Sequence, residues 1–158
     1  MEGETCRRVI DRIRGKLSFP RVRTADTLLH RLVLFRGRMG ELEVDVQVAS
    51  EAVVALWRGK SQAMDPSAAL APIFTDVIAR AVDGGVPVIH DFCGLEFFNS
   101  ATVSAIIRHL KALGERQIHT TVRYDGSLRW QRTFFDALAI TAAKTGHLTV
   151  APVTVPKL

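Results

Sequence analysis

Hydrophobic and polar residues alternate strictly over residues 41–48 of this chain. The apolar positions are Leu42, Val44, Val46 and Val48, and the polar positions are Glu41, Glu43, Asp45 and Gln47. Because successive side chains of a strand point to opposite faces, this pattern predicts a β-strand with one buried and one solvent-exposed face. Residues 52–57 predict a second, more apolar strand, and the short link between the two segments favours a hairpin.

After residue 65 the pattern changes to helices that alternate with strands. Apolar residues at helical spacing predict helices over residues 66–82, 100–113 and 128–144. Strands are expected over residues 86–92, 118–124 and 148–153, with loops over residues 59–65 and 93–99. The order β-β-α-β-α-β-α-β predicts an α/β fold, a single sheet with parallel crossovers and helices on at least one face.

Residues 1–40 differ from the rest of the chain in charge. They hold ten Lys and Arg residues against four acids, whereas the net charge of the whole chain is +5. The apolar residues Cys6, Val9, Ile10, Ile13 and Leu17 lie at helical spacing and predict an amphipathic helix. We favour a helix that covers the domain or forms a dimer, and an arm that contacts an acidic partner, nucleic acid or a membrane is the alternative.

The expected organisation is therefore a basic N-terminal helical extension over residues 1–40 and one domain over residues 41–158. Within the extension, the apolar residues from Leu28 to Val33 favour a short helix that begins near Thr24 or Asp26. Residues 32–35 fit a buried strand equally well.

Composition is that of an ordinary soluble domain. The 158 residues are 47% hydrophobic and 23% charged, which suits one domain that buries about two thirds of its unfolded surface. The chain has no apolar run of transmembrane length and no signal-peptide pattern, so a cytoplasmic location is expected. Two cysteines, Cys6 and Cys93, are too few for a disulfide framework.

No cofactor, metal or catalytic residue is expected. The five histidines, His30, His90, His109, His119 and His147, show no metal-ligand spacing within one element. The glycines have no phosphate-loop or dinucleotide-binding spacing. Asp91 is expected to accept backbone hydrogen bonds at the end of a strand, and Glu96 to be solvated. The chain is therefore predicted not to be an enzyme, and no small-molecule substrate is expected.

Ser100 is the candidate functional residue, because it is placed where a strand and a turn lead into a helix. The first turn of a helix has unpaired backbone N–H groups and the positive end of the helix dipole, so a phosphate on Ser100 would be stabilised there.

The run Phe97-Phe98-Asn99-Ser100-Ala101-Thr102 resembles the "F-[ML]-D-S-[ST]-G" motif of the STAS family, the domain of anti-sigma-factor antagonists. Asn99, Ala101 and Thr102 replace the usual Asp, hydroxyl residue and Gly of that motif. The resemblance extends over roughly residues 41–152 and implies a STAS-like fold. It also implies that Ser100 is the position phosphorylated by a partner kinase.

A looser likeness connects the chain with small bacterial biofilm-signalling regulators of the SiaC type. Their pattern is "G-x-S", then "P" and "L-x-P", then "Y-F-N-T-S". The matching runs are Gly59-Lys60-Ser61, Pro66, Leu70-Ala71-Pro72 and Phe97-Phe98-Asn99-Ser100-Ala101. The acceptor threonine of that family also falls on Ser100.

These observations lead to a first hypothesis, a bacterial signalling module that binds a regulatory protein and is switched by phosphorylation of Ser100. The implied partners are a serine kinase or anti-sigma-like factor and a phosphatase. The expected contact residues are Phe97, Phe98, Asn99, Ala101, Thr102, Val103, Lys60 and Ser61. The alternative is a constitutive scaffold or oligomerisation module without phosphorylation, with contacts made by the N-terminal segment.

Overall fold

The computed structural model describes residues 32–155 of the chain. The predictions made for residues 1–31, among them the basic amphipathic helix and its dimer or binding roles, lie outside these residues. No helix of residues 32–155 combines the length and the apolar character needed to cross a membrane.

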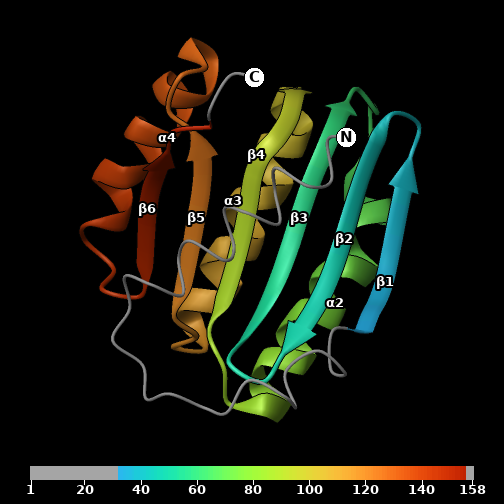
Figure 1. Ribbon diagram of the computed structural model, residues 1–158, viewed down its shortest axis with the longest axis vertical. Helices are drawn as coiled ribbons and strands as arrows, with labels where there is room; N and C mark the ends of the chain where they lie inside the picture. Colours follow the sequence, from blue (N-terminus) through green and yellow to red (C-terminus); the bar gives the residue numbers. More distant parts are fainter. Residues whose placement is uncertain (1–31, 156–158) are drawn as a thin grey trace.

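Six strands and three helices follow one another along the described residues. The strands are β1 (Leu32–Met39), β2 (Leu42–Ala49), β3 (Ala52–Ser61), β4 (Val88–Phe98), β5 (Thr120–Asp125) and β6 (Leu148–Val153). The helices are α2 (Ser67–Gly84), α3 (Ser100–Glu115) and α4 (Arg129–Ala142). From β2 onward this is the order predicted from the sequence, and the predicted α/β fold class is confirmed (Figure 1).

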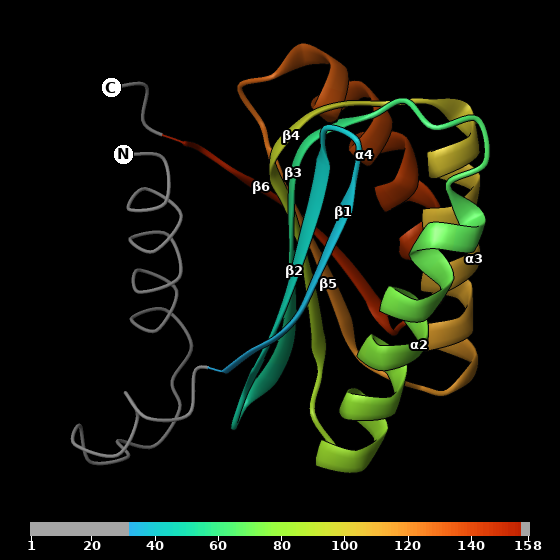
Figure 2. The same cartoon turned by 90° about the vertical axis from the view of Figure 1, so that its right-hand side faces the viewer.

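All six strands form one sheet in chain order, β1-β2-β3-β4-β5-β6. The first three strands pair antiparallel, and β3 to β6 pair parallel through the helical crossovers. The helices α2, α3 and α4 lie on the same side of the sheet (Figure 2). The carboxyl ends of the parallel strands therefore meet at one edge, where each of these helices begins.

Residues 32–39 form a strand, which agrees with the strand that residues 32–35 also fitted and contradicts a helix that continues to Val33. Met39 pairs with Leu42, and Gly40 lies in the two-residue turn between them with φ +58°. Glycine accepts this left-handed backbone at no steric cost, which allows the tight hairpin. The boundary expected between residues 40 and 41 consequently falls inside a hairpin whose two strands belong to the same sheet.

Strands β3 and β4 both continue through segments that the sequence predicted as loops. Gly59, Lys60 and Ser61 pair with Leu95, Phe97 and Phe98, with two register shifts along the pair that each add one residue on β4. At Gly94 the backbone comes so close to β3 that an added Cβ would lie 2.8 Å from the Arg58 side chain. This close approach requires glycine. The glycine and polar residues here therefore accommodate register shifts in a long parallel pair of strands, although in the sequence they resembled loop signals.

Pairing of β4 with β5 ends at Asp91, so the carbonyls that follow on this side of β4 need other partners. The buried side chain of Gln131, on α4, supplies them: its Nε2 donates to the carbonyls of Phe92 at 2.9 Å and Leu95 at 2.8 Å. Its Oε1 accepts from the backbone N–H of Asp125 at 2.7 Å. Gln131 thus joins α4 to two strands at the point where they separate.

The hydrophobic core lies between the sheet and the three helices. Leu42, Val44, Val46, Trp57 and Phe92 contribute from the strands, and α2 buries Leu70, Ile73, Val77 and Ala81 against them. Trp130 packs at the edge of this cluster, and its ring meets that of Phe98 at a centroid distance of 5.2 Å. Both tryptophans therefore contribute to the core.

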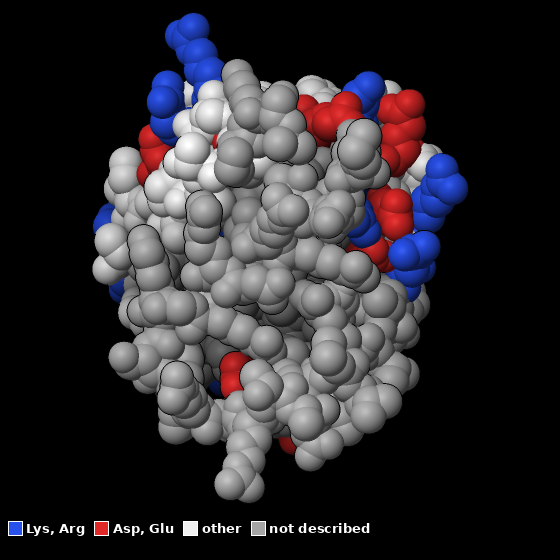
Figure 3. Space-filling view, viewed as in Figure 1, with Lys and Arg blue, Asp and Glu red and all other residues white. Residues whose placement is uncertain are grey.

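The polar face of β2 is only partly exposed, which differs from the expectation of a fully solvated face. Asp45 is buried, and its two oxygens accept hydrogen bonds from Arg36 on β1, at 2.9 Å, and from Arg58 on β3. The hydrogen bond that Arg36 donates to Asp45 raises the pKa of the Arg36 guanidinium. Acidic and basic side chains lie intermingled along the described rim of this face (Figure 3). Arginines from both neighbouring strands thus compensate the charge that the alternating pattern placed in solvent.

Candidate functional site

The start of α3 is held by Asn99, the residue before Ser100. The Asn99 Oδ1 accepts hydrogen bonds from the Thr102 N–H at 3.0 Å and from the Thr102 hydroxyl at 2.9 Å. Its Nδ2 donates to the carbonyl of Ala63 at 2.7 Å. Asparagine is a strong N-cap because its side-chain oxygen replaces a missing helical acceptor. Asn99 therefore fixes the helix start and connects it to the loop between β3 and α2.

Ser100 occupies the first position of α3, as the sequence predicted, and its side chain is exposed. The capping role belongs to Asn99, so the Ser100 hydroxyl is not needed for that role. Within the described residues, the N–H groups of Ser100 and Ala101 have no hydrogen-bond partner, which is usual for the first turn of a helix. A negatively charged group at Ser100 would meet these donors and the positive end of the helix dipole.

Ser61 and Thr102, both expected at the contact surface, are buried instead. Their hydroxyl oxygens lie 2.6 Å apart. Since the Thr102 hydroxyl donates to Asn99, the Ser61 hydroxyl must donate to Thr102. The backbone N–H of Asn99 also donates to the Ser61 carbonyl at 3.1 Å. Because β3 continues to Ser61, this residue belongs to the sheet and anchors α3, and a buried Thr102 is a poor alternative acceptor for phosphate.

The two phenylalanines at the end of β4 point in different directions. Phe97 is 47% exposed, whereas Phe98 packs against the rings of Trp130 and Phe134. This is the alternation of a strand, with one ring in the core and the next at the surface. Ala101 and Val103 are half-buried. Of the expected contact residues, Phe97 is therefore the one that is exposed, and the expected acceptor Ser100 is exposed as well.

Lys60 is half-buried beside this surface. Its Nζ lies 3.8 Å from an oxygen of Glu96 and 4.0 Å from an oxygen of Glu41. Glu96 is exposed, as expected, and the Asp91 carboxylate accepts from the Cys93 N–H at 2.9 Å. We use the name α3 surface for the patch at the start of α3. It consists of Lys60 on β3, Glu96 and Phe97 on β4, and Ser100 on α3.

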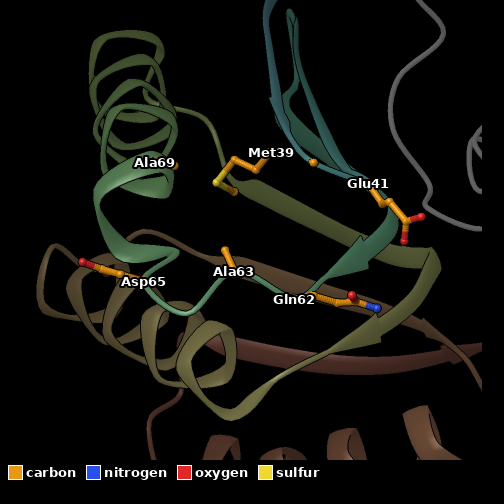
Figure 4. A pocket seen from close by; sticks show the side chains of 7 residues that line it. Met39, Glu41, Gln62, Ala63, Asp65 and Ala69 are labelled. Atoms are coloured by element: carbon orange, nitrogen blue, oxygen red, sulfur yellow. The ribbon is translucent and has the colours of Figure 1, made fainter.

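A hollow of about 350 Å³ lies between the β1–β2 turn and the segment from β3 to α2. Met39, Ala63 and Ala69 contribute apolar surface to it (Figure 4). The carboxylates of Glu41 and Asp65 lie at opposite ends of the hollow (Figure 4). Because its lining also includes Ala63, whose carbonyl is bound by Asn99, the hollow adjoins the segment to which α3 is attached.

Two histidines that the sequence left scattered come together in the core. His90 on β4 and His109 on α3 place their Nε2 atoms 3.0 Å apart, and Trp57 donates from Nε1 to His90 Nδ1 at 3.1 Å. Burial lowers the pKa of His90 to about 4. Burial, together with the neighbouring His90, lowers the pKa of His109 to about 2. Both rings are therefore neutral at physiological pH, and no signal within either element could have predicted this pair.

Among residues 32–155, no group of three or more His, Cys, Asp or Glu side chains is arranged to hold a metal ion. The pair His90 and His109 lacks a third such ligand within this part of the chain.

The fold is similar to that of the crystal structure of an anti-sigma factor antagonist from Mycobacterium paratuberculosis. The sequence identity is 18%, the match covers 71% of this chain and 86% of that chain, and the TM-score is 0.48. No protein-family model matches the chain, and no curated protein is significantly similar to it. A likeness this distant says nothing about partners or activity.

Proposed function

We propose that this chain is a non-enzymatic signalling module that binds a regulatory protein through the α3 surface, and that phosphorylation of Ser100 releases this partner. The observation that carries the proposal is the exposure of Ser100 at the first position of α3, beside the exposed ring of Phe97. The sequence resemblance to the STAS family points to the same residue.

The local structure supports a switch that leaves the fold intact. Asn99 caps α3, and Thr102 and Ser61 anchor it from inside, so Ser100 contributes little to the stability of the helix. A phosphate adds about −1.5 to −2 charges at neutral pH. The first-turn N–H groups and the helix dipole favour that charge in the free protein.

In a complex the same charge has the opposite effect. An exposed phenylalanine next to the acceptor suits a partner that buries apolar surface, and a phosphate inside such a contact would have to be desolvated. The partner would therefore bind the unmodified form, and a kinase and a phosphatase would set the ratio of the two forms.

The first experiment is the intact mass of the protein purified from its own cells, before and after treatment with a phosphatase. We expect an added phosphate that maps to Ser100 and is absent from Ser100→Ala. Phosphate mapped to Ser104, which is exposed on the same helix, would move the acceptor by one turn. Absence of phosphate under all growth conditions would leave a constitutive binding module and contradict the switch.

The second experiment measures partner binding with a photo-crosslinking residue at position 97. Ser100→Ala should retain the crosslinked partner, and Ser100→Asp should lose it. Ser127→Asp is the matched control, because Ser127 is an exposed serine just before α4 and receives the same charge. Equal crosslinking by the two Ser100 variants would refute release by charge.

A further inference from the structure

A groove of about 310 Å³ lies between α2 and α3. Its walls are mainly apolar and include Phe74 and Ile78 from α2 and Ala105 and Ala112 from α3. This volume is at the lower end of the range of about 300–1,000 Å³ seen for small-molecule sites, which are typically apolar with a few polar groups. His109 is one of the polar groups that line it.

The hydrogen bonds beneath the groove determine which nitrogen of His109 carries the proton. Trp57 Nε1–H can only donate, so His90 Nδ1 accepts and a neutral His90 carries its proton on Nε2. His90 Nε2–H then donates to His109 Nε2, 3.0 Å away. A neutral His109 must therefore carry its proton on Nδ1.

This Nδ1–H has no acceptor within the described part of the protein, although His109 is buried and only 4% exposed. A buried donor without an acceptor loses its hydrogen bonds to water and gains none in return, which makes such a group unusual in a folded protein. The donor chain from Trp57 through His90 thus ends on the unsatisfied N–H of His109, a residue that lines the groove.

The charge of the groove indicates what kind of acceptor fits. Arg108, exposed on α3, lines the groove and donates to the Ser67 hydroxyl at 2.9 Å, across to the first residue of α2. No acidic side chain is among the described residues that line the groove. The fixed donors of His109 and Arg108 favour an acceptor with negative charge.

We propose that the groove between α2 and α3 binds a small unbranched monocarboxylate, with its carboxylate on His109 Nδ1–H and Arg108 and its alkyl chain against Phe74 and Ile78. The His109 N–H lies below the accessible surface, and the half-buried Phe74 ring stacks on the imidazole at a centroid distance of 4.0 Å. Because this N–H is buried, the side chains that cover it must shift when the carboxylate binds. The ligand is bound without chemical change, and the site does not depend on Ser100.

Hexanoate is the probe, titrated into the full chain labelled with ¹⁵N at histidine. Binding should be saturable and should shift the Nδ1 resonance of His109, which reports a new hydrogen bond at that atom. Hexanol, which has the same alkyl chain without the charge, should bind about tenfold more weakly. Absence of a saturable shift at His109 Nδ1 would overturn the proposal.

Three variants separate the groove from nonspecific binding. Ala112→Leu fills the groove from a half-buried position and should abolish the shift, whereas Ala79→Leu, on an exposed part of α2 outside the groove, should leave it unchanged. Arg108→Gln should weaken hexanoate about tenfold and leave hexanol unaffected. Equal hexanoate binding by Ala112→Leu and Ala79→Leu would show that the hydrocarbon chain lies elsewhere and would also overturn the proposal.

Discussion

Acidification should destabilise this protein through the buried pair of His90 and His109. In the folded state the pKa values are about 4 and about 2, whereas an unfolded histidine has a pKa of about 6.5. Between pH 7.5 and pH 5 the unfolded chain therefore takes up protons that the folded chain does not. The free energy of unfolding therefore decreases with falling pH. The contribution of the neutral pair is present above pH 6.5 and is lost as the pH falls below that value.

The magnitude can be worked out from the same values. Each pKa unit corresponds to about 1.4 kcal/mol, and pH 5 lies about 1.5 units below the unfolded pKa. Each ring should then cost about 2 kcal/mol at pH 5, and the pair about 4 kcal/mol. For His90 the loss levels off near pH 4, where the folded ring begins to accept a proton. A loss of this size is a large part of the stability of a typical domain.

Denaturant unfolding at pH 7.5 and pH 5.0, at constant ionic strength, measures this difference directly. His109→Gln removes one titrating ring and keeps a carbonyl oxygen to accept from His90. The pH-dependent loss should therefore shrink by about 2 kcal/mol more than in His119→Gln, which makes the same change at an exposed position. Equal losses in the two variants would refute the assignment of the pH dependence to the buried pair.

Two further predictions concern polar side chains that hold the site in place. Gln131→Leu should lower the free energy of unfolding by about 3 kcal/mol or more, because it leaves three backbone groups without partners. Gln62→Leu, on the surface, should have little effect. Similar melting of both variants would contradict this role of Gln131. Asn99→Ala should cost about 1–2 kcal/mol in the same assay, and Asn99→Asp less, since a carboxylate still caps α3 and suits the helix dipole. An Asp variant as unstable as the Ala variant would show that the bond to Ala63, rather than the cap, is what matters.

The periodicity of the sequence was enough to predict most elements of the domain. The alternating residues of β2, the helical spacing in α2 and the run that forms β6 each carry a strong local signal, and their order implies parallel crossovers. The position of Ser100 at the start of α3 was also predictable, because it depends on a local change from strand to helix.

The tertiary structure decided the features that depend on residues far apart in the sequence. The end of β4 is a strand only because β3 runs beside it, and Ser61 is buried only because Thr102, 41 residues later, meets its hydroxyl. His90 and His109 are 19 residues apart and on different elements, so no spacing rule could pair them. Local sequence determines which way a segment folds, because backbone preference and burial act over a few residues, whereas a buried polar group finds its partner only after the segments have packed together.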